Sequence, residues 1–112
     1  MAGLTGGPTG ASGVVAVGHW NPVNDEFKPN VGLDYPKQFE TGVYCLRREG
    51  GGTYNNRRVM VSVDAANTKE PGKATVTTDS SNNGCPEEGE VTVDTFAAGA
   101  PSNDVAFQVL VY

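Results

Sequence analysis

The chain has 112 residues, a net charge of −5, 15 glycines and seven prolines. This length allows one domain with a single core. The acidic balance argues against nucleic-acid binding, no apolar stretch is long enough to span a membrane, and no charged or apolar leader indicates a signal peptide.

Residues 1–13 are rich in glycine and carry no charge and little hydrophobic area. Burial of such a segment on its own cannot offset its conformational entropy. We interpret it as an extended arm that orders when it docks on a neighbouring subunit or a partner surface, with residues 14–112 forming the domain. The expected contact residues of the arm are Gly3, Leu4, Thr5 and Pro8.

Short apolar runs, separated by Gly, Pro, Asn and Thr, indicate a loop-rich all-β fold. No window shows a 3.6-residue period, so we expect little or no helix. The segment 21–37 is expected to be a long ordered loop, either functional or simply covering one end of the sheets, with a possible short strand near Phe27. The firm strands are expected at 13–18, 41–48, 57–64, 73–78, 90–96 and 105–112.

Six or seven strands at this spacing predict a small antiparallel β-sandwich of the immunoglobulin-like or Greek-key type, with a barrel as the alternative. The final strand places Val105, Phe107, Val109 and Val111 on one face. The opposite face is also fairly apolar, which predicts a strand covered on both sides. We therefore expect the C-terminal strands to lie at the centre of the fold.

The only two cysteines are Cys45 and Cys85. One disulfide between them would close a loop of about 40 residues and stabilise the domain by roughly 3–4 kcal/mol. Two buried free thiols are the alternative. A bridge without a signal peptide would fit a protein that is made inside a cell and later works outside it.

Charge is unevenly distributed along the chain. Residues 1–58 hold six cations and five acids (+1), and residues 59–112 hold two cations and eight acids (−6), which sum to −5. Four cations flank the glycine-rich segment 49–56, which we predict to be a hairpin loop. These arginines form either a docking patch for an acidic partner or two solvated strand ends: Arg47, Arg48, Arg57 and Arg58.

Catalytic and metal-binding motifs are not evident. The lone histidine has no nucleophile motif around it, and no Cys/His cluster has metal-ligand spacing. Asp79–Asn83 offers oxygen atoms but lacks a calcium-loop pattern, so we expect no metal and no cofactor. A sugar-stacking platform formed by His19, Trp20 and Tyr54 is possible, although such residues are more commonly part of a core or an interface.

The pattern Gly42-Val-Tyr-Cys45, Cys85-Pro86, Val91-Thr-Val-Asp-Thr-Phe96 and a final strand with Phe107 resembles a small β-sandwich domain of actinobacterial proteins and their phages. In that group the domain follows glycine-rich stretches in secreted or tail-fibre proteins. The resemblance implies the fold and a Cys45–Cys85 pairing, and no activity.

In architecture, a short acidic domain with a glycine-rich arm is similar to the capsid decoration proteins of tailed phages. The expected function is therefore non-enzymatic: a structural protein of the virion surface that binds the major capsid protein or another virion subunit. A homo-oligomer, with a trimer favoured, is expected. The alternatives are a tail or fibre-tip module that binds a cell-surface glycan and, least favoured, a small enzyme.

Overall fold

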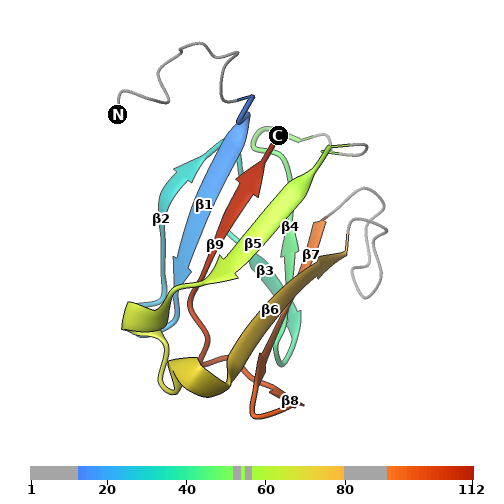
Figure 1. Cartoon of the computed structure of the whole chain (residues 1–112). Coiled ribbons are helices and arrows are strands. Elements are labelled where there is room, and N and C mark those ends of the chain that lie inside the picture. Colours follow the sequence, from blue (N-terminus) through green and yellow to red (C-terminus); the bar gives the residue numbers. More distant parts are fainter. Residues whose placement is uncertain (1–12, 52–53, 55–56, 80–90) are drawn as a thin grey trace.

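The computed structural model describes residues 13–51, 54, 57–79 and 91–112 as two antiparallel sheets packed as a sandwich (Figure 1). The predicted all-β sandwich is confirmed. The helical pieces in the described part of the chain are two 3-10 turns, Ala65–Asn67 and Pro71–Lys73, in agreement with the missing helical period. Except for Gly13, the predicted arm lies outside the described residues.

The first sheet has the strand order β2-β1-β9-β5, and these four strands lie side by side in Figure 1. Its strands are β1 (Ala16–Asn21), β2 (Glu26–Val31), β5 (Val59–Val63) and β9 (Phe107–Val111). The C-terminal strand β9 is paired on both sides, with β1 and with β5. This confirms its predicted central place.

The second sheet has the order β3-β4-β7-β6, with β8 paired to β7. Its strands are β3 (Lys37–Glu40), β4 (Val43–Leu46), β6 (Ala74–Asp79), β7 (Val91–Ala97) and β8 (Ala100–Pro101). The described residues thus contain nine strands rather than six or seven. The additional strands are β3, whose four residues are all exposed, and the two-residue β8. Neither has an apolar alternation that sequence reasoning can detect.

The core lies between the two inner faces. Along β9, Phe107, Val109 and Val111 are completely buried, as the alternation predicts. Aromatic rings from both sheets meet them, and the Tyr44 and Phe107 centroids are 5.4 Å apart. The full set of clustered buried residues is Ala16, Trp20, Phe27, Leu33, Tyr44, Leu46, Tyr54, Val91, Val93, Phe107, Val109 and Val111.

Three sequence predictions need correction. The first strand begins at residue 16 and continues to Asn21, because Trp20 pairs with both Phe27 and Phe107. The outer face of β9 is not covered as predicted, since Gln108 is exposed and Leu110 only half-buried. Finally, 49–56 is not a hairpin loop, because β4 and β5 belong to different sheets.

Cys45 lies on the outer side of β4. Its neighbours Tyr44 and Leu46 point into the core, so the alternation directs Cys45 to the outer face of the five-stranded sheet. It is nevertheless only 1% exposed, and its cross-strand partner Thr92 is fully buried. The described residues contain no free cysteine, and Cys85, the other cysteine of the chain, lies within 80–90, outside them.

Gly18 permits the close approach of β2 to β1. A Cβ at this position would lie 2.7 Å from Phe27 Cε1 and closer still to Cζ. We therefore expect Gly18→Ala to destabilise the domain by about 1–3 kcal/mol through overpacking, as measured by denaturant unfolding. Gly72→Ala is the matched control, because a Cβ there would meet nothing within 4 Å. Equal unfolding midpoints for the two variants would contradict this account of the core.

Candidate docking surface

A row of apolar side chains crosses the outer face of the four-stranded sheet. Val17 pairs with Val31 on one side and with Leu110 on the other, and Leu110 pairs with Met60. Directly paired residues of antiparallel strands project to the same face. These four residues, one from each strand, form a continuous line that we call the apolar row.

The apolar row is open to solvent. Val31 is 59% and Met60 58% exposed, while Val17 and Leu110 are half-buried. A shallow hollow of about 120 Å³ lies at the Met60 end, where Ser62, Gln108 and Leu110 also line it. A contiguous exposed apolar surface is a common mark of a protein interaction site.

Above the apolar row, towards the chain termini, lies a second line formed by Val15, Tyr112 and Arg58. Val15 is 40% exposed and donates its backbone N–H to the Val111 carbonyl oxygen at 2.7 Å. The Arg58 guanidinium lies 5.6 Å from the centre of the Tyr112 ring, within cation–π range. This end of the surface therefore combines apolar area with a positive charge.

On the other side of the apolar row lies a polar line of His19, Gln108 and Ser62. His19 Nε2 is 2.6 Å from Asp64 Oδ2, and its Nδ1 is 2.9 Å from the Lys28 carbonyl oxygen. The Asp64 carboxylate and the Lys28 carbonyl are both hydrogen-bond acceptors, so either ring nitrogen can donate to the oxygen beside it. The His19–Asp64 contact links β1 to the end of β5 across the central strand β9.

Asp64, directly after β5, is held by contacts with three other residues. It accepts hydrogen bonds from Asn67 Nδ2 at 2.8 Å and from the Ala66 backbone N–H at 3.1 Å, in addition to its contact with His19. The bond from Asn67, followed by that from His19, lowers the pKa of Asp64 below its usual range. Asp64 also caps the 3-10 turn 65–67. Its charge therefore stabilises the join between β5 and the following turn.

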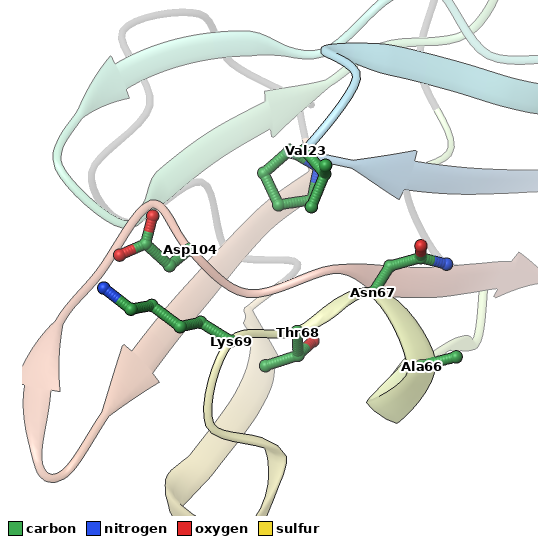
Figure 2. A pocket seen from close by; sticks show the side chains of 7 residues that line it. Val23, Ala66, Asn67, Thr68, Lys69 and Asp104 are labelled. Carbon is green, nitrogen blue, oxygen red and sulfur yellow. The ribbon is translucent and has the colours of Figure 1, made fainter.

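A larger cleft of about 460 Å³ lies beyond this turn (Figure 2). Figure 2 shows Lys69 and Asp104 at one end of it and Asn67 and Ala66 at the other. The remaining lining residues are Pro22, Val23 and Thr68. The Thr68 hydroxyl is already engaged, donating to the Asp64 carbonyl oxygen at 2.7 Å and accepting from the Ala106 N–H at 2.9 Å. It is therefore part of the framework and not a free ligand group.

The structure does not bring the predicted stacking residues together. His19 and Trp20 are adjacent on β1 and project to opposite faces, and Trp20 is only 6% exposed. Tyr54 is 9% exposed, and its hydroxyl donates to the Gly32 carbonyl oxygen at 2.7 Å. Among the described residues, the exposed rings that sequence reasoning did not select are Tyr35 and Phe39, at 55% and 48%.

The predicted arginines do not share one environment. Arg48 lies over the Tyr54 ring at 5.8 Å, and the Arg57 N–H donates to the Tyr54 carbonyl oxygen at 3.2 Å. Arg58 instead belongs to the outer face beside Tyr112. Arg47 is half-buried at the end of β4. The four therefore do not form the paired shoulders of one hairpin.

Within the described ranges, no group of three or more acidic, histidine or cysteine residues is placed to hold a metal ion. The segment 79–83 that offered calcium ligands is not described beyond the backbone of Asp79. The arm residues Gly3, Leu4, Thr5 and Pro8 also lie outside the described residues. No helix in the described part of the chain has the length and hydropathy of a membrane span.

Comparison with protein families, curated proteins and solved structures finds no match to this chain. Its candidate site therefore rests on geometry alone. The apolar row has no sequence signature of its own, because its four members come from strands far apart in the chain. The alternation of β9 places Leu110 opposite the core, but the sequence pattern predicts that this face is covered.

The lowered pKa of Asp64 predicts that the free energy of unfolding falls at acid pH. A folded-state pKa below the unfolded value means that the stabilisation is complete above about pH 4 and is lost as the pH falls through the folded pKa. Asp64→Asn should lower the free energy of unfolding by about 1 kcal/mol at neutral pH and flatten its decline at acid pH. Urea unfolding between pH 2 and 7 measures this.

Asp34→Asn is the control for that series, because Asp34 is an exposed acid. It should leave both the neutral-pH stability and the acid limb close to those of the parent chain. An acid limb that is as steep in Asp64→Asn as in the parent would show that Asp64 does not contribute to it.

Proposed function

We propose that this protein is a non-enzymatic structural protein of a virion, a capsid decoration protein that docks on the outer shell of a tailed phage. Docking would use the arm of residues 1–13 together with the outer face of the four-stranded sheet. The observation that best supports this proposal is the exposed apolar row, which lies next to the point where the arm joins the domain.

The proposal depends on many identical contacts acting together. The row is only four strands wide, about 15 Å at the usual strand spacing, so a single contact would be weak. Identical weak contacts repeated over a shell, or within a homotrimer, add through effective concentration. Arg58, beside Tyr112, would pair with an acidic group of the major capsid protein or another virion subunit.

A disulfide between Cys45 and Cys85 belongs to the same proposal. The support for it is that Cys45 is buried on an outer face, where part of the chain must cover it. Such a bridge would hold the segment 80–90 against the five-stranded sheet and stabilise a domain that works outside the cell.

The alternative, a tail or fibre-tip module that binds a glycan, is favoured by the cleft beside Val23. Asn67, Lys69 and Asp104 supply donors and acceptors of the kind that sugars use. The buried Trp20 does not supply a stacking surface there. Glycan binding would therefore depend on the cleft and not on the predicted platform of His19, Trp20 and Tyr54.

The docking proposal predicts that the protein stays bound to capsid particles. Purified protein should sediment with empty capsids, and deletion of residues 1–12 or the change Met60→Lys should each weaken retention at least tenfold. Lys69→Ala, in the cleft, is the matched control and should bind like the parent. Failure to sediment with capsids, combined with binding to cell-wall glycan that Lys69→Ala weakens, would overturn the proposal in favour of the alternative.

The proposed Cys45–Cys85 disulfide predicts a difference in mass and in stability between the oxidised and the reduced protein. Protein purified under air should be about 2 Da lighter than reduced protein, and reduction should lower the free energy of unfolding by about 3–4 kcal/mol. Cys45→Ser with Cys85→Ser should match the reduced form. Two alkylatable thiols in the unfolded, unreduced protein would contradict the bridge.

A further inference from the structure

We propose that Tyr35 and the neighbouring β1–β2 turn form a binding site for a neutral carbohydrate, with the Tyr35 ring as the surface on which a sugar ring stacks. The turn comprises residues 22–25, between β1 and β2. It lies at the end of the sandwich away from the C-terminus (Figure 1), because β1 begins beside Val111 and ends at Asn21. The site is therefore separate from the proposed docking surface and does not depend on the virion proposal.

The Tyr35 ring is exposed and at the same time held in place. The residue is 55% exposed, and its hydroxyl donates to the Asp25 carbonyl oxygen at 3.2 Å. The ring makes T-shaped contacts with two buried rings, Trp20 at 5.6 Å and Phe27 at 6.4 Å between centroids. These contacts fix the orientation of the ring before a ligand arrives, which lowers the ordering cost of binding.

The cleft of about 460 Å³ adjoins this ring across the turn. Val23 lines the cleft and is two residues from Asp25, a distance of at most about 7 Å along the backbone. Burial raises the pKa of Tyr44, and the nearby Asp104 and Asp25 carboxylates raise it further. Both carboxylates therefore lie near the Tyr44 hydroxyl, so the cleft and the Tyr35 ring belong to one surface.

The groups on this surface suit the two kinds of contact that a sugar makes. Lys69 and Asp104 lie at one end of the cleft (Figure 2), and both are exposed. An ammonium group donates hydrogen bonds and a carboxylate accepts them, so together they can bind sugar hydroxyls. Val23, which is 74% exposed, and the Tyr35 ring supply apolar area for the C–H face of a pyranose.

The surrounding charge selects against an acidic sugar. Three exposed carboxylates lie next to the Tyr35 ring or in the cleft, namely Asp25, Asp34 and Asp104. Lys69 is the cation among the residues that line the cleft. Like charges placed against one another oppose binding, so a uronic or sialic acid would meet repulsion. A neutral hexopyranose would not.

A protein partner fits this surface less well than a sugar. Its exposed apolar area is one ring and one valine side chain, separated by the polar turn, whereas a stable protein interface buries roughly 800 Å² per partner. A short saccharide needs only one stacked ring and a few hydrogen bonds. Binding through so few contacts is weak, with a Kd on the order of 1 mM.

Proton–nitrogen correlation NMR of the full chain tests the site with three neutral probes: maltotetraose, cellotetraose and N-acetylated chitotetraose. At least one probe should give saturable shifts at the amides of the turn and of Tyr35. Tyr35→Ala should weaken binding about tenfold, and Tyr35→Phe, which keeps the ring, should stay within about threefold of the parent. Phe39→Ala, which removes an exposed ring elsewhere, is the matched control and should bind like the parent.

A second variant separates binding from folding, because the Tyr35 ring also packs against Trp20 and Phe27. Asp104→Ala removes an exposed carboxylate and should weaken binding about threefold to tenfold, with the unfolding midpoint unchanged. Absence of shifts at these amides with all three probes would overturn the inference, and so would equal affinity in the parent, Tyr35→Ala and Asp104→Ala. Tighter binding of trigalacturonic acid than of the neutral probes would overturn the ligand class.

Discussion

The structure depends on the period-two alternation of one strand, β9. Its inward residues, Phe107, Val109 and Val111, are completely buried between the sheets, and it is the strand to which both β1 and β5 pair. A shift of one residue would exchange its two faces and expose the core. The same alternation sends Leu110 outward, so the constraint that builds the core also creates the apolar row.

The two outer faces of the sandwich differ in a way that bears on function. On the five-stranded sheet, Cys45 and Thr92 point outward and are still buried. On the four-stranded sheet, Val31 and Met60 point outward and are more than half exposed. The exposed apolar side chains of the four-stranded sheet give this face a different character from the outer face around Cys45 and Thr92.

Polar contacts connect strands and turns of the four-stranded sheet. His19 and Asp64 connect β1 with β5, and Asp64 also orders the turn that follows through Asn67. The histidine beside an acid therefore has a structural explanation. Both ring nitrogens of His19 are engaged, Nε2 by Asp64 and Nδ1 by the Lys28 carbonyl oxygen.

Sequence reasoning succeeded where a single segment contains the whole signal. The alternation 105–112 was sufficient to identify β9, its buried face and its central position, because burial of every second residue is a local property of a strand. The short apolar runs were likewise sufficient for the all-β class. The same reasoning failed for β3, since its four exposed residues have no face that must be buried.

The sequence alone thus determined the fold class, the central strand and the uncharged character of the arm. The tertiary structure decided which strands became neighbours. This choice placed Val31 beside Val17 and put β4 and β5 in different sheets, with Arg48 over Tyr54 and Arg58 over Tyr112. The physical reason is that the choice of neighbouring strands depends on how distant segments of the chain fill one core together. No single stretch of the chain contains that information.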